Sequence, residues 1–150
     1  MDPLPHRYEV HLRALPQGPV ALATADGASL ECQPPPQFGG PAGAQSPEYL
    51  LTEALAGCFA LTFRALAEAS GLSWQNLRCR ALGTLDRVEG RLAFSGFELE
   101  AHLELPEEGD RERAARLLEK AERQCLVAAS LACPVRLAAT VATRPAGSTR

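Results

Sequence analysis

Two of the five cysteines are the residues of this chain best placed to do chemistry. Cys58 lies in the middle of an apolar segment that begins at residue 46, and Cys125 lies late in a second segment, residues 111 to about 126. Both segments are expected to be helical. A thiol is a soft nucleophile whose reactivity depends on its surroundings, and free cysteine is also among the most buried residue types. The two cysteines are therefore either unreactive residues that pack in the core or a redox pair. For either cysteine considered alone, packing is the commoner role.

The other candidate ligands and nucleophiles do not form a second site. His6, His11 and His102 have no ligand-like spacing, and the chain contains no Cys-x-x-Cys, so we expect no metal site. Among the remaining thiols, Cys79 is expected in the core and Cys133 is a weak rival to Cys125 as a second reactive thiol. The chemistry of the chain is expected to centre on Cys58 and Cys125.

Length and composition are typical of a single domain spanning residues 1–150, with an ordered core of about 7–143 and a flexible tail of 144–150. A net charge of −3 gives no electrostatic footprint for nucleic acid. We expect no secretory leader, no stretch that approaches a membrane span and, with an odd number of cysteines, a reducing compartment. The expected protein is cytoplasmic and does not bind a membrane.

Period-2 alternation predicts a strand at residues 7–14. Residues 20–25 and 28–32 flank Asp26-Gly27, a dipeptide that favours a tight turn, and are expected to form a hairpin of two strands. Residues 33–45, rich in proline and glycine, are expected to be a loop without regular structure. Two further strands, 76–88 and 91–105, are predicted with a bulge near Gly96, and a last strand over 135–143.

The helix that carries Cys58 is predicted to start at Ser46 and Pro47, with Glu48 at the positive end of its dipole, and to end at Gly71. Its apolar residues cover more than one stripe, so burial on most sides is expected. The second helix is capped by Asp110, and its inward face is predicted to contain Ala114, Ala115, Leu117, Leu118, Ala121 and Leu126. The order β-β-β-α-β-β-α-β indicates an α+β protein.

Two motifs around these cysteines resemble those of a known family. The first comprises Phe38-Gly39-Gly40, Ser46-Pro47-Glu48-Tyr49-Leu50-Leu51 and Ala54-Leu55-Ala56-Gly57-Cys58, and the second is Gln124-Cys125-Leu126-Val127. Together they resemble the OsmC/Ohr family of thiol peroxidases over about residues 7–143. Their joint occurrence favours a redox pair over two packed thiols.

The resemblance implies an OsmC-like fold, with antiparallel sheets wrapped around two central helices in an intertwined homodimer and active sites at the subunit interface. It implies that Cys58 attacks organic hydroperoxides and that Cys125 resolves the product, without metal or flavin. It further implies a dithiol reductant, such as a lipoylated protein, and a role in oxidative or osmotic stress defence.

In this family an arginine from the N-terminal strands pairs with the glutamate of the Pro-Glu motif, here Glu48. Arg13 is the nearest candidate for the arginine and Arg7 the next, although neither aligns cleanly, and without an arginine weak activity is expected. Glu48 and Cys58 are ten positions apart, about 15 Å along an unbroken helix. Either the helix breaks or two subunits contribute to one site. A plain alternative is that Glu48 only complements the helix dipole.

The sequence thus predicts a cysteine-based organic hydroperoxide peroxidase with the catalytic residues Cys58, Cys125, Glu48 and Arg13. Two other functions stay open. One is a dimer of the same fold that holds a small apolar ligand at its interface without catalysis, and the other is a structural stress protein without a ligand.

Overall fold

The computed structural model describes residues 3–106 and 110–144, and the side chains of that part as far as residue 143. By its internal contacts the chain forms two compact units, Met1–Leu50 and Leu51–Arg150. The expectation that these form one domain stays a prediction. The tail expected over 144–150 lies, from residue 145 onward, outside the described residues.

The N-terminal unit contains a three-stranded sheet of order β1-β2-β3, formed by β1 (Val10–Arg13), β2 (Val20–Thr24) and β3 (Ser29–Cys32). Both pairings are antiparallel. The turn predicted at Asp26-Gly27 is confirmed, with Gly27 at a φ of 103° that side chains rarely adopt. The first strand is shorter than expected.

The loop that follows β3 is not wholly irregular, as had been expected. A single turn of 3₁₀ helix, η1 (Pro36–Phe38), lies within it and ends at Gly39, whose φ is 82°. At Gly40 a Cβ would lie 1.6 Å from the carbonyl oxygen of Pro34. The Gly-Gly pair of the first motif therefore serves the backbone path of this loop.

The helix α1 (Pro47–Ser70) begins and ends where its local signals predict. The Ser46 hydroxyl accepts a hydrogen bond from the Tyr49 N–H at 3.3 Å, as an N-cap does. At the other end Gly71 has a φ of 66°, and its N–H and that of Leu72 donate to Glu68 and Ala67 carbonyls. This pair of bonds is a Schellman motif, so the helix has a defined end.

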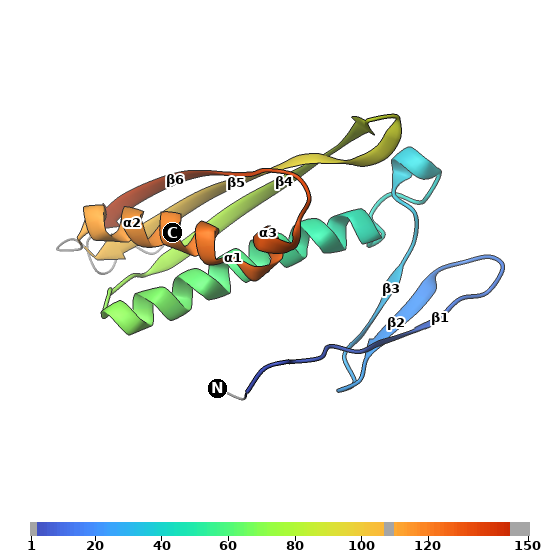
Figure 1. The fold of residues 1–150 in the computed structure, drawn as a ribbon, viewed down its shortest axis with the longest axis horizontal. Coiled ribbons are helices and arrows are strands. Elements are labelled where there is room, and N and C mark those ends of the chain that lie inside the picture. Colours follow the sequence, from blue (N-terminus) through green and yellow to red (C-terminus); the bar gives the residue numbers. More distant parts are fainter. Residues whose placement is uncertain (1–2, 107–109, 145–150) are drawn as a thin grey trace. The chain divides into compact units, whose positions relative to one another are not determined.

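The C-terminal unit contains a second sheet of order β4-β5-β6, formed by β4 (Asn76–Val88), β5 (Arg91–Pro106) and β6 (Val135–Arg144). β4 and β5 are antiparallel, and the predicted bulge is confirmed: Thr84 pairs with Gly96 but Leu85 pairs with Phe94. β5 and β6 are parallel, so the expectation of antiparallel sheets is wrong for this pair. The helices α2 (Arg111–Gln124) and α3 (Leu126–Ser130) form the crossover that a parallel pair requires (Figure 1).

The core of the C-terminal unit lies between α1, β5 and α2. One stripe of α1 is fully buried, at four-residue spacing, and alternate residues of β5 face it. From α2, Ala114, Leu118 and Ala121 are buried as predicted, whereas Leu126 is 76% exposed and was wrongly placed in the core. The buried residues of α1 and β5 are Leu55, Phe59, Phe63, Ala67, Phe97, Leu99, Ala101, Leu103 and Leu105.

The rest of α1 is not buried, contrary to the expectation for a helix that is apolar on most sides. Leu61 is 55% exposed and Tyr49 is 53% exposed. By length and composition alone α1 is apolar enough to cross a membrane, so the expectation that no stretch approaches such a span is wrong. Its buried stripe nevertheless packs in the core of this unit. The α+β class and the element order are confirmed, and α1 is a core helix with an uncovered outer face.

Candidate active site

Cys58 lies near the middle of α1, directly before the buried Phe59. This position places its thiol at the margin of the stripe that packs in the core, and the residue is half-buried. A helical position fixes the direction of the side chain, because Cα–Cβ bonds tilt toward the helix N-terminus. Cys58 is thus held on a helix and is not fully enclosed.

Cys125 lies at the corner between α2 and α3 and not within a continuous helix, as had been expected. α2 ends at Gln124, and Cys125 has extended backbone angles, φ −65° and ψ 115°. Its Sγ accepts a hydrogen bond from the Ala128 N–H at 3.5 Å and so caps α3. The residue is fully buried. The break in the helix therefore turns this thiol inward.

The structure brings the two thiols together, and their hydrogen bonds decide the ionisation of Cys58. Burial raises the pKa of the Cys58 thiol, but hydrogen bonds from the Val127 N–H, the Cys125 thiol, the Leu126 N–H and the Thr62 hydroxyl outweigh it. The pKa of Cys58 consequently lies below its ordinary value of 9.0. Hydrogen bonds to the charged form favour that form. Cys58 therefore ionises to the thiolate at a lower pH than an unperturbed cysteine does.

The same contact has the opposite effect on Cys125. Burial raises the pKa of the Cys125 thiol, and the hydrogen bond with Cys58 and the negative charge there raise it further. Because one proton is shared by two sulfurs, the first ionisation belongs to the pair, and the structure favours its location at Cys58. When the pair loses its first proton, the half-buried sulfur of Cys58 is therefore the favoured thiolate and the fully buried thiol of Cys125 is its hydrogen-bond donor.

Glu48 lies in the first turn of α1 and is half-buried. α1 is continuous from Pro47 to Ser70, so a break between Glu48 and Cys58 does not occur. Their ten-residue separation corresponds to about 15 Å along the axis. A catalytic role for Glu48 stays a prediction, and within one chain α1 does not bring it to the sulfur.

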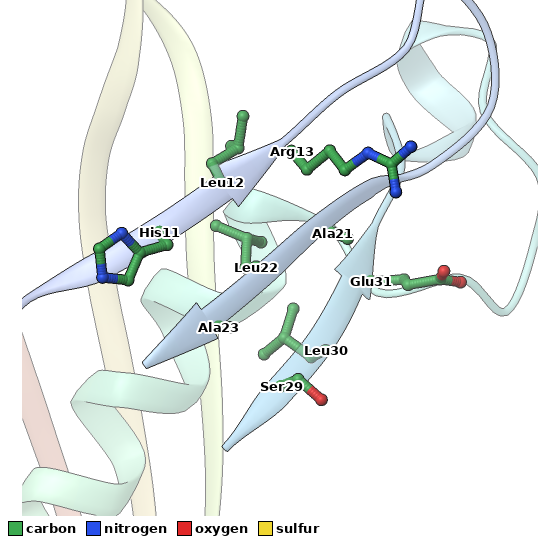
Figure 2. Close-up of a pocket in the computed structure, with 9 residues that line it drawn as sticks. All are labelled: His11, Leu12, Arg13, Ala21, Leu22, Ala23, Ser29, Leu30 and Glu31. Carbon is green, nitrogen blue, oxygen red and sulfur yellow. The ribbon is translucent and has the colours of Figure 1, made fainter. Parts of the chain in front are cut away.

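Arg13 lies on β1 in the N-terminal unit and is exposed. In the register of the sheet it lies in one row with Ala21 and Glu31 (Figure 2). The adjacent row along the strands, whose side chains lie on the opposite face of the sheet, consists of Leu12, Leu22 and Leu30. These residues border a hollow of about 530 Å³ on this sheet. The assignment of Arg13 to the active site stays a prediction.

The hydrogen-bonding groups that shift the pKa values of Cys58 and Cys125 include none of the other described cysteines. Burial raises the pKa of the Cys79 thiol, as expected for a cysteine of the core margin. Cys32 is buried in the N-terminal unit, and Cys133 is half-buried before β6. Within residues 3–106 and 110–144, no group of three or more His, Cys, Asp or Glu is placed to hold a metal ion.

Sequence reasoning missed the donors that surround Cys58. The Leu126 and Val127 amides leave no signature in a sequence, because every residue except proline has one. Thr62 did leave a signal: it lies four positions after Cys58 on the same helix, the spacing at which side chains are neighbours.

Comparison with known proteins identifies the family. The family model of the OsmC-like proteins matches residues 40–140, which include α1 and both cysteines. The chain belongs to the OsmC-like family. This OsmC-like chain is also 24% identical to the uncharacterized protein YmaD of Bacillus subtilis over 106 residues, 69% of this chain and 71% of that protein.

Solved structures share the fold of this OsmC-like chain. An OsmC-like protein of unknown function from Vibrio cholerae superimposes with a TM-score of 0.82 at 13% identity, over 90% of this chain and 99% of that one. An organic hydroperoxide resistance protein OsmC from Legionella pneumophila gives a TM-score of 0.71 at 23% identity, over 91% and 97%. Another such resistance protein, from Elizabethkingia anophelis, gives 0.71 at 19%, over 96% and 100%. The family thus includes organic hydroperoxide resistance proteins.

Proposed function

We propose that this protein is a thiol-dependent peroxidase that reduces organic hydroperoxides. The observation that carries the proposal is the asymmetry of the cysteine pair, a half-buried Cys58 with a lowered pKa beside a fully buried Cys125 with a raised pKa. A two-cysteine peroxidase requires a thiolate that the substrate can reach and a second thiol that reacts with the resulting sulfenic acid. The hydroperoxide resistance proteins among the structural neighbours support the same assignment.

In the first step the Cys58 thiolate attacks the terminal oxygen of the hydroperoxide, the one that carries the hydrogen. A sulfur–oxygen bond forms, the O–O bond breaks, and the leaving alkoxide takes a proton from solvent to become the alcohol. Cys58 is then a sulfenic acid. In the second step Cys125 gives up its proton and its sulfur attacks the Cys58 sulfur. A disulfide bond forms, the sulfur–oxygen bond breaks, and the departing hydroxide takes up that proton and leaves as water. A dithiol reductant restores both thiols by disulfide exchange.

The local contacts support this order of events. Cys58 is the sulfur that a peroxide can reach, whereas Cys125 is fully buried and in direct hydrogen-bond contact with Cys58. Once Cys58 is oxidised, its negative charge is lost and so is the contribution that raises the pKa of Cys125. Oxidation of the first thiol therefore favours ionisation of the second.

A count of free thiols tests the function. The reduced protein is treated with a slight excess of cumene hydroperoxide, and we expect Cys58 and Cys125 to be lost together while the other three cysteines stay reduced. Cys58→Ser should consume no more peroxide than buffer, and Cys79→Ser is the matched control, since that thiol lies on β4 outside the pair. Consumption by Cys58→Ser at the wild-type rate would refute the proposed function.

We also propose that the active form is a homodimer. The outer face of α1, with Leu61, and the exposed Leu126 of α3 are apolar surfaces of the C-terminal unit, and Leu12 and Leu30 are exposed on the N-terminal sheet. Scattered exposed apolar residues are ordinary, but a long apolar helix with one buried stripe favours a covering partner. A molecular mass of about 32 kDa in light scattering, twice the 16.0 kDa of the chain, is expected. A mass of one chain at the concentrations of the assay would refute it.

A further inference from the structure

Thr62 combines two contacts with a single residue, Cys58. Its Oγ1 donates a hydrogen bond to the Cys58 carbonyl oxygen at 2.8 Å, one turn back along α1. The two residues lie four positions apart on α1, a spacing at which side chains are neighbours, and this hydroxyl is one of the hydrogen-bonding groups that lower the pKa of the Cys58 thiol. Thr62 is half-buried, so water competes only partly for its proton. A hydroxyl group has one proton to donate and here has two acceptors.

The two acceptors differ in charge. The carbonyl oxygen is neutral in every state, whereas the sulfur is negative only when Cys58 is ionised. Hydrogen bonds to an ionised acceptor are roughly twice as strong as those between neutral groups. The proton of the hydroxyl is therefore expected to rest on the carbonyl oxygen in the thiol state and to turn to the sulfur in the thiolate state.

We propose that the Thr62 hydroxyl is a catalytic hydrogen-bond donor to the Cys58 thiolate, the side-chain counterpart of the Leu126 and Val127 amides. Thr62 reaches the sulfur from α1 itself, and the amides reach it from α3. The hydrogen bond to the Cys58 carbonyl oxygen selects the rotamer that keeps the Thr62 hydroxyl beside Cys58. The benefit for peroxide reduction rests on the proposed function, whereas the effect on ionisation does not.

Few charged groups lie near Cys58 along the chain, so the effect of the Thr62 hydroxyl on the Cys58 pKa can be measured with little interference. Cys125 is the titratable side chain in contact with Cys58 from the corner of α2 and α3. Along α1 the nearest charged residues are Glu53 and Arg64, five and six positions away, and α3 contains no acidic or basic residue. A change in ionisation on substitution of Thr62 is therefore attributable to its hydroxyl.

The test is the pH dependence of iodoacetamide alkylation at Cys58, followed by mass spectrometry without any peroxide. Thr62→Val keeps the shape of the side chain and removes the proton. We expect the Cys58 pKa to rise by about one unit, which means about tenfold less thiolate below the pKa. Thr62→Ser should keep the wild-type value, and Thr52→Val, another threonine of α1, should not change it. Far above the pKa, the rates of variant and wild type should converge.

An unchanged pKa in Thr62→Val, with an unchanged melting temperature, would overturn the proposal. A raised pKa in Thr62→Ser as well would assign the effect to packing and would overturn it too. The test separates the two proposals made for this site. If the pKa rises but wild type consumes no peroxide, the hydrogen bond is established and the proposed function fails.

Discussion

The two units of the molecule differ in how much of a buried core each of them contains. The C-terminal unit has its own core, built from α1, β5 and α2, and it carries both cysteines and the donors around Cys58. The N-terminal unit has a sheet whose apolar row, Leu12 to Leu30, is largely exposed. Among the described residues 3–50, only Cys32, Pro35 and Ser46 are buried.

This difference places the candidate site in the unit that has a core of its own. Within the C-terminal unit, backbone amides, a thiol and a hydroxyl lower the pKa of Cys58 against the effect of burial. The arginine that the family resemblance implies would have to come from the other unit, where Arg13 lies. Groups that favour the Cys58 thiolate therefore lie within the C-terminal unit, and an arginine would add to their effect.

The largest expected effect comes from Cys125→Ser, which keeps the thiolate but removes the second thiol of the pair. The first equivalent of hydroperoxide should give the sulfenic acid of Cys58 and a second equivalent the sulfinic acid, so that turnover with a dithiol should fall at least about tenfold. Mass spectrometry after excess peroxide should find two added oxygens on Cys58. Cys133→Ser is the control, and sustained wild-type turnover by Cys125→Ser would show that the pair is not the working unit.

The sequence predicted α1 well because its signals are local. Ser46, Pro47 and Gly71 act within one turn, through a cap, a fixed φ and a left-handed end. The corner at Cys125 has no such signal, since cysteine is not a usual N-cap and neither glycine nor proline adjoins it. The continuous helix predicted there was wrong for that reason.

The pairing of strands that are distant in the sequence also could not be predicted from local sequence patterns. Alternation indicates that β6 is a strand but gives no direction, and its parallel pairing with β5 follows from the crossover through α2 and α3. Both cysteines of the candidate site were found from their motifs. The amides of Leu126 and Val127 could not be found, because a backbone N–H acquires a role only when the fold places it.

A smaller effect, on the free energy of unfolding and not on catalysis, tests whether apolar side chains stabilise the two units to different extents. Phe59 is fully buried on α1, and Phe59→Ala should reduce the free energy of unfolding by about 3–5 kcal/mol. Leu12 is 61% exposed on β1, and Leu12→Ala should change it by about 0.5 kcal/mol or less, as surface substitutions do. Urea denaturation followed by circular dichroism measures both. Equal losses would mean that the N-terminal sheet is as firmly packed as the core of the other unit.

The smallest expected effect is that of Arg13→Ala on the ionisation of Cys58. Because hydrogen bonds within the C-terminal unit already outweigh burial, we expect the alkylation pKa of Cys58 to rise by only about 0.3 unit, less than with Thr62→Val. Arg80→Ala is the matched control, since Arg80 is an exposed arginine paired with Glu100 on the other sheet. A rise in Arg13→Ala larger than in Thr62→Val would reverse the comparison between the units. The thiolate would then depend mainly on the N-terminal sheet, and the amides of α3 would only position a sulfur that the arginine ionises.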